Sequence, residues 1–548
     1  MSERPDAFTS RIAVSIAVVS VLIAGAAYLQ ADAASRDDRA NRDSKRYSTE
    51  ALGRNIVGDA RTNFDYYTAY TAWSEMDRLA DFAESQGDAR GKSRYTTMRD
   101  RLSRLSPMLA PPYLNAETGE VDSNRWDAER YVEDVAILAE KFAAASAVKD
   151  AWDNKANTYI VHLTLLAAAL ALLGLSTTVP GASTRAIISA TGGLLSTIAV
   201  AWAVVTVATK VPDLRDQKGA IEAYAKGAGF MHQEKWQEAA KEFDKAVQAS
   251  ADYGRAYQQR GEANFNLGKR TEAASDYLKA LGLGERSGAS MGMLAWIYYE
   301  MGRFDEAITM NQAALDVTPD ELWVRFDLGL AQLAAGKKDE ASATFKAATD
   351  LAARVVADAK AAGQEAPSMV WYGLDSSVES LIGLAEAVAG DAETPPPAKI
   401  VNGKAAAELA TRVAGEISGL AVSLEYFGKP AQGSPTAVIE NVRFAPLDEA
   451  GKAGEEAEEF DENVHNVALR FDFKGMKDGS HVVFKIYQDS QETVEWRLVQ
   501  LWSQGVEGGF EAALAAEGGD FTPGDYKIVG FVDGHYVMSG TFSIAAPQ

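Results

Sequence analysis

Cysteine is absent from this chain of 548 residues. Its absence excludes disulfides, thiolate metal sites, iron–sulfur clusters and cysteine nucleophiles, and it leaves the redox compartment open. Histidine is scarce, and no two histidines have metal-ligand spacing on a predicted helix. The five are His162, His232, His465, His481 and His535. We therefore predict no metal site and no other cofactor. His162 falls near one end of an apolar run, where a headgroup contact is the expected role.

Catalytic motifs are absent as well. The chain has no glycine loop for phosphate, no GxSxG elbow and no dinucleotide fingerprint, so we predict no enzymatic activity and no catalytic residues. Eight carboxylates crowd between Asp448 and Glu462 around Lys452. Their spacing does not match an EF-hand loop, so the sequence favours a solvated acidic loop over a loose calcium site.

Positive charge is in short supply: 54 lysines and arginines face 77 aspartates and glutamates, a net charge of −23. This charge repels nucleic acid at long range, and we expect no nucleic-acid partner. The length exceeds what one hydrophobic core supports, so several domains are expected.

Three runs lack charge entirely: residues 12–29, 159–179 and 186–209. Each approaches the roughly 20 residues that a membrane-spanning helix needs, which predicts a lipid bilayer as a partner. The last two form a hairpin whose turn contains Pro180 and Gly181. The first has two readings, because Ala31-Asp32-Ala33 resembles a signal-peptidase site: an uncleaved anchor or a cleaved signal.

Both readings place residues 34–156 outside the cytoplasm, and the even hairpin then places the following repeats outside too. The flanking basic residues argue for the reverse orientation. Five follow the first run, namely Arg36, Arg39, Arg42, Lys45 and Arg46. We expect a bacterial cell-membrane protein whose later domains are extracytoplasmic, with a cytoplasmic-facing orientation as the alternative.

The segment 34–156 is predicted to be a helical hairpin, interrupted near Pro107, Pro111 and Pro112. Apolar residues at three- and four-residue steps predict one buried face on each arm, packed within the chain or between copies. The first stripe is Leu52, Ile56, Ala60, Phe64, Tyr67, Tyr70, Trp73, Met76 and Leu79, and the second is Tyr131, Val135, Leu138, Phe142, Ala145 and Trp152.

An internal repeat of 34 residues is the strongest pattern. Two alanine series recur at this period: Ala239, Ala273, Ala307 and Ala341, and then Ala246, Ala280, Ala314 and Ala348. A third series is Gly227, Gly261, Ala295 and Gly329, and turns are marked by Gly268, Gly302 and Gly336. Small residues suit close helix crossings, and glycine suits the turn between paired helices. The large residues Phe243, Tyr277 and Phe345, which Asn311 replaces in the third unit, are expected to wedge one unit against the next.

This pattern resembles the tetratricopeptide repeat family, as in GRFDEAITMNQAALDVTP at 302–319 and GKRTEAASDYLKAL at 268–281. The resemblance covers about a quarter of the chain. It implies a solenoid of four helix pairs and binding of a protein or peptide along the first helices. By the family's inward positions, the groove residues would be Tyr224, Met231, Gln258, Phe265, Trp296, Tyr299, Trp323, Phe326 and Leu330.

This aromatic lining lacks the Lys and Asn set with which some family members hold a C-terminal carboxylate, and it suits an apolar helix or extended segment. Replacing Trp296 and Phe326 together with Ala should weaken capture of a partner without unfolding the solenoid. The alternative is that the chain's own helices, 405–427 or part of 367–390, fill the groove.

Beyond the repeats, residues 391–397 read as a semi-rigid proline-rich linker, and 403–426 as an amphipathic helix. The pattern then alternates with period two, and the turns Asp478-Gly479 and Asp533-Gly534 separate predicted strands. Residues 522–544 resemble the last two strands of an immunoglobulin-like β-sandwich of exported bacterial proteins. Such a domain implies contacts, not chemistry.

The predicted fold is therefore mainly α and multi-domain, with transmembrane helices, a helical hairpin, a tetratricopeptide α-solenoid and a C-terminal all-β sandwich. The expected domains are an N-terminal anchor or signal (1–33), the hairpin domain (34–156), a membrane hairpin (157–210), the solenoid (217–353), further helices with the linker (354–426) and the sandwich (435–548). The predicted function is a membrane-anchored scaffold that binds a protein through the groove. The alternative is a structural subunit of a larger assembly or homo-oligomer.

Overall fold

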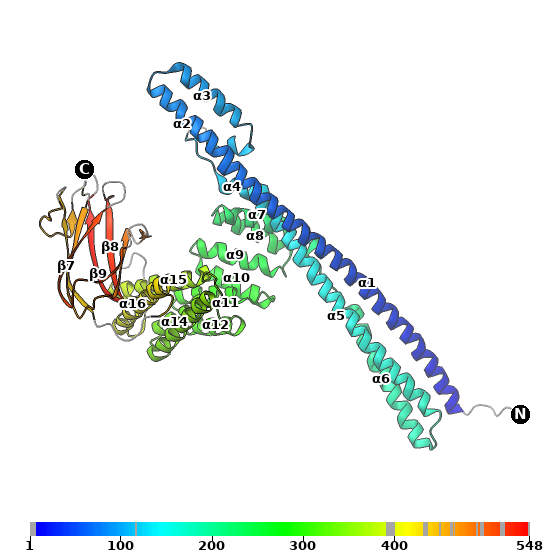
Figure 1. Ribbon diagram of the computed structural model, residues 1–548. Helices are drawn as coiled ribbons and strands as arrows, with labels where there is room; N and C mark the ends of the chain where they lie inside the picture. Colours follow the sequence, from blue (N-terminus) through cyan, green and yellow to red (C-terminus); the bar gives the residue numbers. More distant parts are fainter. Residues whose placement is uncertain are drawn as a thin grey trace. The chain divides into compact units, whose positions relative to one another are not determined.

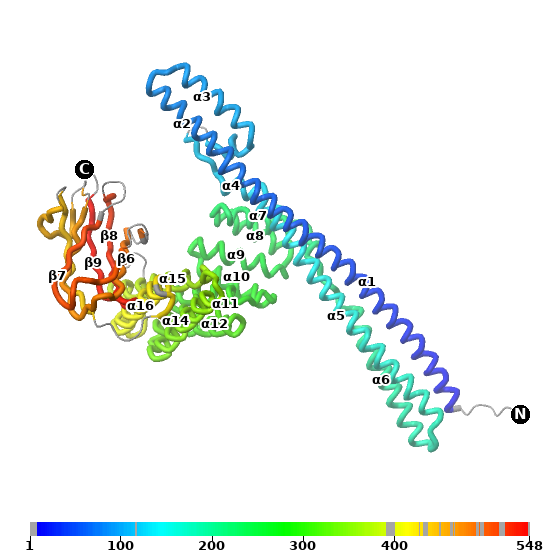
Figure 2. Tube along the Cα trace, viewed as in Figure 1, coloured from blue at the N-terminus to red at the C-terminus, as the bar shows by residue number. Residues whose placement is uncertain are grey.

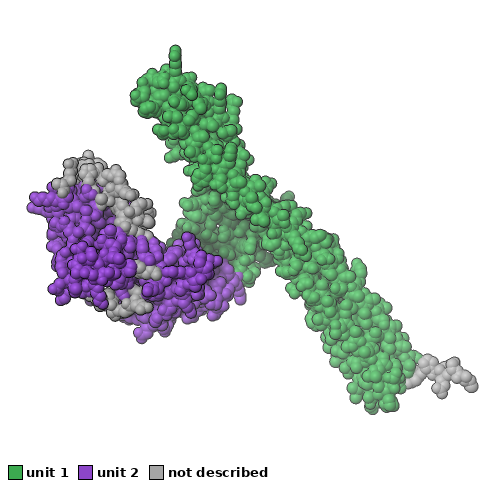
Figure 3. Space-filling view, viewed as in Figure 1, with its two compact units in different colours: residues 1–285 green, residues 286–548 purple. Residues whose placement is uncertain are grey.

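The computed structural model describes residues 7–115, 118–390, 400–430, 437–448, 451–460, 464, 466–488, 491–493, 498–515 and 521–545. The chain forms two compact units, Met1–Glu285 and Arg286–Gln548 (Figure 3). The predicted linker at 391–397 lies outside the described residues, as do parts of the acidic loop.

Unit 1 begins with one very long helix, α1 (Ala7–Asn63), which continues through a π-helical stretch, η1 (Phe64–Tyr70), into α2 (Thr71–Ser85). No break occurs at the expected domain boundary after residue 33. The elements that follow are α3 (Ala89–Leu102), η2 (Pro107–Leu109), α4 (Ser123–Asp127), η3 (Ala128–Val132), α5 (Glu133–Ser176), α6 (Ala182–Ala208) and η4 (Leu214–Asp216).

Helices α1 and α5 run antiparallel and form a stalk (Figure 1). The buried residues of α1 recur every seven positions: Ile12, Val19, Ala26, Ala33 and Ala40. On α5 the buried residues Tyr159, Leu166 and Leu173 have the same spacing. A seven-residue repeat is the signature of coiled-coil packing, and the alanines allow the two backbones to approach closely.

Three helical stretches carry windows apolar enough to cross a membrane: Phe8–Ser85, Ser123–Ser176 and Ala182–Ala208, with hydropathies of 2.4, 2.0 and 1.8. Their apolar parts pack together at one end of the stalk, with Ile12, Leu166 and Ala199 in a shared core (Figure 2).

The expected headgroup contact of His162 is wrong, because this side chain is fully buried. Its ring lies between Tyr159 and Trp202, with centroid distances of 5.7 and 5.0 Å.

The stripe predicted along residues 52–79 is only partly buried. Trp73 is 6% exposed, as predicted, but Leu52, Ile56 and Tyr67 are 62%, 60% and 71% exposed. The reason is that α5 and the preceding η3 pack against a different face of α1, where a Cβ on Gly58 would lie 2.7 Å from the Tyr131 ring of η3. A stripe at helical spacing does not tell which face meets a neighbour when several faces are apolar.

At the other end of the stalk, α2, α3 and α4 enclose a small core (Figure 1). Trp73 packs there with Leu109 and Leu114, and the Tyr113 and Trp126 rings meet edge to face at 4.9 Å. The predicted second stripe is partly confirmed: Ala145 is buried, but Phe142 is 39% exposed.

Four helix pairs follow, as the 34-residue period predicts. Unit 1 holds α7 (Ala220–His232), α8 (Trp236–Ala249), α9 (Gly254–Asn266) and α10 (Arg270–Gly282). Unit 2 holds α11 (Gly288–Glu300), α12 (Phe304–Val317), α13 (Leu322–Ala334) and α14 (Lys338–Ala361). All eight alanines of the two series are fully buried.

The large residue of each second helix packs against the first helix of its own repeat. Phe243 also shares a core with Ala263 of the next repeat, so the predicted wedge is confirmed there. A Cβ on Gly227 would lie 2.6 Å from the Phe243 ring, and Gly329 stands in the same relation to Phe345. Glycine is needed there because the ring occupies the space of a side chain. In the third repeat these two positions hold Ala295 and Asn311, which are both buried, so both positions change together.

Unit 2 continues with α15 (Ser368–Ala389) and α16 (Gly403–Phe427), and then a β region. One sheet has the order β1-β3-β7, and the other has the path β2-β9-β8-β4-β5 with β6 paired to β4. The strands are β1 (Val438–Pro446), β2 (Glu459–Phe460), β3 (Asn466–Lys474), β4 (His481–Gln488), β5 (Gln491–Glu492), β6 (Leu498–Leu501), β7 (Glu507–Ala515), β8 (Gly524–Val532) and β9 (His535–Ile544). The sheets share one core, in which Phe471 and Phe484 lie 5.8 Å apart.

Candidate partner-binding surface of the repeats

The groove positions predicted in unit 1 are all half-buried: Tyr224, Met231, Gln258 and Phe265. The Tyr224 ring lies 5.5 Å from Phe243 and 5.3 Å from Tyr253, so one side of it belongs to the core of the repeats. The Arg270 guanidinium lies 4.1 Å from the centre of the Phe265 ring. These side chains keep part of their surface open in unit 1.

A residue of the stalk reaches this side of the repeats. Glu140 of α5 is 3% exposed; one carboxylate oxygen accepts a hydrogen bond from the Tyr253 hydroxyl at 2.9 Å, and the other from the Arg255 guanidinium at 2.8 Å. Burial, reinforced by the Glu140 charge, raises the pKa of Tyr253. Arg255 occupies the position in α9 that Trp323 occupies in α13, two periods later. The groove position of the second repeat that Arg255 holds is therefore occupied by a contact within the chain itself.

The outer side of α7 is covered by the same helix. A Cβ on Gly229 would lie 3.0 Å from the Glu133 side chain of α5. A first repeat has no preceding unit to bury its exposed face, and solenoids need an end cap for this reason. Helix α5 therefore acts as the cap at the start of the repeats.

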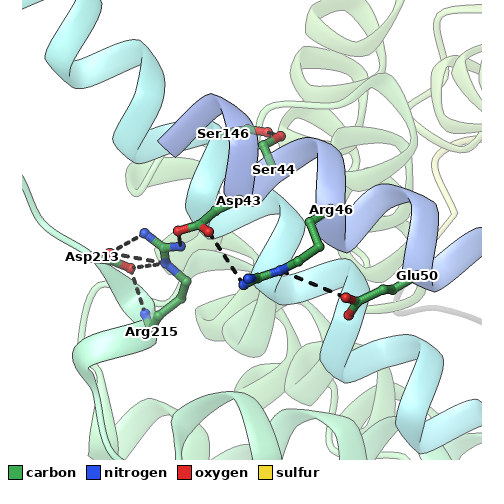
Figure 4. Close-up of polar contacts among 7 residues, drawn as sticks. All are labelled: Asp43, Ser44, Arg46, Glu50, Ser146, Asp213 and Arg215. Atoms are coloured by element: carbon green, nitrogen blue, oxygen red, sulfur yellow. Dashed lines mark hydrogen bonds and ion pairs between the residues drawn. The ribbon is translucent and has the colours of Figure 1, made fainter. Parts of the chain in front are cut away.

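A polar cluster ties the segment before α7 to the stalk (Figure 4). Arg215 contacts Asp213 at 2.6 Å and Asp43 of α1 at 3.1 Å, and its hydrogen bond to Asp213 raises its pKa. Ser44 of α1 and Ser146 of α5 share a hydrogen bond of 2.8 Å. The cluster joins both stalk helices and the connection that leads into the repeats.

In unit 2 the predicted groove residues divide into two groups. Trp296 and Trp323 are half-buried, whereas Tyr299 is 7% exposed and Phe326 and Leu330 are 2% exposed each. Trp296 stacks on Tyr299 at 5.2 Å and donates a hydrogen bond to Glu300 at 3.1 Å. The two tryptophans are thus the large aromatic groups of this set that retain open surface.

Most of helix α13 is buried because α15 and α16 pack on it in addition to α12 and α14, although Trp323 keeps part of its surface open. A Cβ on Gly373 of α15 would lie 3.1 Å from Leu322 of α13. The chain's own helices therefore cover the fourth repeat, and α15 makes the larger share of this contact. A Phe326→Ala change is expected to cost about 3–5 kcal/mol in stability, so we now expect the Trp296 and Phe326 double variant to lose stability as well as affinity for a partner.

Sequence reasoning missed Glu140, Arg255 and Tyr253 as a site. A single glutamate on a long helix belongs to no sequence pattern from which its partner could be predicted. Its partner Tyr253 lies 113 positions later in the chain. Metal binding has no visible support in the described ranges, where no group of three or more histidines and carboxylates is placed to hold an ion.

Comparison with known proteins identifies the repeats. A family model described as "Tetratricopeptide repeat" matches residues 293–355, and a second with the same description matches residues 254–283. No curated protein matches the chain. The chain therefore contains tetratricopeptide repeats, which suggest a protein-interaction scaffold and point to a non-catalytic interaction module.

Solved structures with similarity include "Crystal structure of MamA protein", 22% identical over 28% of this chain and 80% of that chain, with a TM-score of 0.24. A second is "Crystal structure of YrrB: a TPR protein with an unusual peptide-binding site", 19% identical over 30% of this chain and 89% of that chain, with a TM-score of 0.24. A third is the Cut9-Hcn1 hetero-tetramer of the APC/C, 14% identical over 71% and 92%, also at 0.24. At these scores the likenesses carry no argument about ligands or assembly.

Proposed function

We propose that this protein is a membrane-anchored scaffold that binds a protein partner through the inner surface of its repeats. The observation that carries this proposal is the Glu140 contact, because it joins the first repeats to a stalk whose other end holds three apolar helices. A helix pair fixed to such a stalk would hold the first two repeats at a set distance from a bilayer.

The proposed contact residues are those of the predicted groove that keep open surface: Gln258, Phe265, Trp296 and Trp323, with parts of Tyr224 and Met231. Aromatic anchors dominate the energy of protein interfaces, and tryptophan is the most enriched of them. The partner that suits this lining is an apolar helix or an extended segment with apolar side chains. Tyr299, Phe326 and Leu330 would instead support these anchors from beneath.

The first apolar run is proposed to be an uncleaved anchor. Ala33 is 1% exposed and packs with Ala156 and Tyr159 in the middle of α1, so cleavage there would remove one side of the stalk core. The mass of the mature chain tests this proposal. A chain that retains residues 1–33 and resists carbonate extraction from membranes is expected; a soluble chain that begins near residue 34 would contradict it.

The repeats and the β region, which we propose is immunoglobulin-like, are assigned to the extracytoplasmic side. The cysteine-free sequence makes this testable with single cysteines and a membrane-impermeant maleimide. Val317→Cys, at a position 52% exposed in the repeats, should react in intact cells. Ser183→Cys, at an exposed position in the first turn of α6, should react only after lysis. The opposite pattern would place the repeats in the cytoplasm.

A further inference from the structure

The exposed stripe of the stalk carries an inference about assembly. Six exposed positions of α1 and η1 recur at steps of three and four: Thr49, Leu52, Ile56, Ala60, Asn63 and Tyr67. This spacing places them on one side of a helix, here about 27 Å long at 1.5 Å per residue. The stripe holds no charged residue, and its large members are 60–71% exposed.

Three arginines beside the stripe each pair with a carboxylate of the same chain. Arg46 pairs with Glu50 at 3.8 Å, Arg54 pairs with Asp134 at 3.7 Å, and Arg61 pairs with Asp65 at 2.9 Å. Gly53, beside the stripe, has open space where a Cβ would be. Such a surface is apolar along its centre and has no side chain at Gly53 on its edge, so another helix can approach it closely.

We propose that this stripe is the contact between two copies of the chain, packed side by side through α1. The inference rests on the membrane anchoring in the proposed function. Copies anchored in one bilayer have the same orientation, so each presents the same stripe at the same height. A two-fold axis along the membrane normal then brings Ile56 of each copy to the same level as Ile56 of the other. Two-fold interfaces of this kind are self-complementary, whereas an unrelated partner would need a matching stripe of its own.

The two stalks together would form a four-helix arrangement in which α1 helices are central. Each two-helix stalk buries one seam of α1 against α5, and the second copy would bury another. The aromatic Tyr67, inside the π-helical stretch η1 that follows α1, would mark the end of the contact farthest from the apolar helices.

The absence of native cysteine makes disulfide trapping a direct test. Full-length Leu52→Cys, Ile56→Cys and Ala60→Cys variants are oxidised in native membranes. Ala147→Cys, exposed on α5 of the stalk, is the matched control. A product of twice the chain mass that is several-fold more abundant at the stripe positions than at Ala147 is expected. An equal yield at all positions, no product, or an adduct with a different protein would overturn the proposal.

A second variant protects the test from misfolding. Ile56→Asp should convert detergent-extracted dimers to monomers and leave stalk helicity unchanged, because the position makes few contacts within the chain. A dimer that persists with Ile56→Asp would also overturn the proposal. Membrane extraction measured on the same samples separates this failure from a failure of anchoring.

Discussion

The two ends of the repeat series are both covered by the chain's own helices, but the covers differ in chemistry. In unit 1, α5 meets the repeats through a buried carboxylate that binds Tyr253 and Arg255. In unit 2, α15 packs on α13 where Gly373 meets Leu322, and the same helix buries the apolar Leu374 and Leu381. A buried hydrogen-bonded charge specifies one geometry, whereas apolar packing supplies more stability with less directional demand. The first cover therefore orients the repeats, and the second stabilises them.

The largest predicted effect is loss of the third repeat when Ala307 is replaced with Arg. Ala307 is fully buried in α12, and a charge forced into this close crossing should cost more than about 4 kcal/mol. Hydrogen exchange over α11 to α13 should rise toward that of an unfolded chain. Protection equal to the wild type would show that the crossing is not close.

The second largest effect is expected from weakening the apolar packing of α15. Leu374→Ala should cost about 2–5 kcal/mol because it leaves a cavity between α15 and its neighbours. Protease sensitivity of α15 measures this loss. Tyr372→Ala, which is 61% exposed on the same helix, is the control and should change little. Equal sensitivity of the two variants would contradict the assigned role of α15.

Loss of the Glu140 contact between α5 and the repeats should cost less stability. Glu140→Ala should remove two hydrogen bonds and destabilise the contact between stalk and repeats by about 1–3 kcal/mol, with Arg255 half-exposed and able to rehydrate. Exchange should rise over α7 and α9 but not over the α1–α6 bundle. Asp150→Ala, on the exposed side of α5, is the matched control. If both variants behave alike, α5 does not orient the repeats.

The smallest effect concerns pH. Desolvation in the crowded α13 raises the pKa of Asp327 to about 7, above the ordinary carboxyl value near 4. The folded state then holds a proton that the unfolded state releases, so this contribution is fully present below about pH 4 and is lost as the pH rises through 7. The melting temperature of unit 2 should fall across this range. Asp327→Asn should flatten the dependence, and an unchanged slope would contradict it.

The repeats were predictable because their signal is local and periodic. Small residues at fixed 34-residue spacing determine where helices cross, and the structure places helix pairs at those positions. The alternating strands β3, β4 and β8 were predictable for the same reason. Strand β7 contains Gly508, Gly509 and three alanines, and its sequence lacks the alternation that marks a strand.

The packing of α5 and α15 on the repeats, and the face of α1 that meets α5, were not predictable from sequence pattern alone. The stripe that includes Leu52, Ile56 and Tyr67 is apolar and helical in spacing, yet η3 and α5 pack on another face of α1, where Gly58 meets Tyr131. The bond from Tyr253 to Glu140 links residues far apart in sequence, and nothing local marks either one. Choice of face and long-range pairing depend on which elements meet, and that depends on the whole fold.

The most direct test of the scaffold function is partner capture by the full-length chain in mild detergent. Wild type, Trp296→Ala, Trp323→Ala and the Tyr372→Ala control are tagged at the C-terminus and purified from native membranes. A protein recovered in stoichiometric amount with wild type and control, and about 30-fold more weakly with either tryptophan variant, is expected for anchor residues worth about 2 kcal/mol. Equal recovery with all four chains, or no recovery with any, would contradict binding through the repeats.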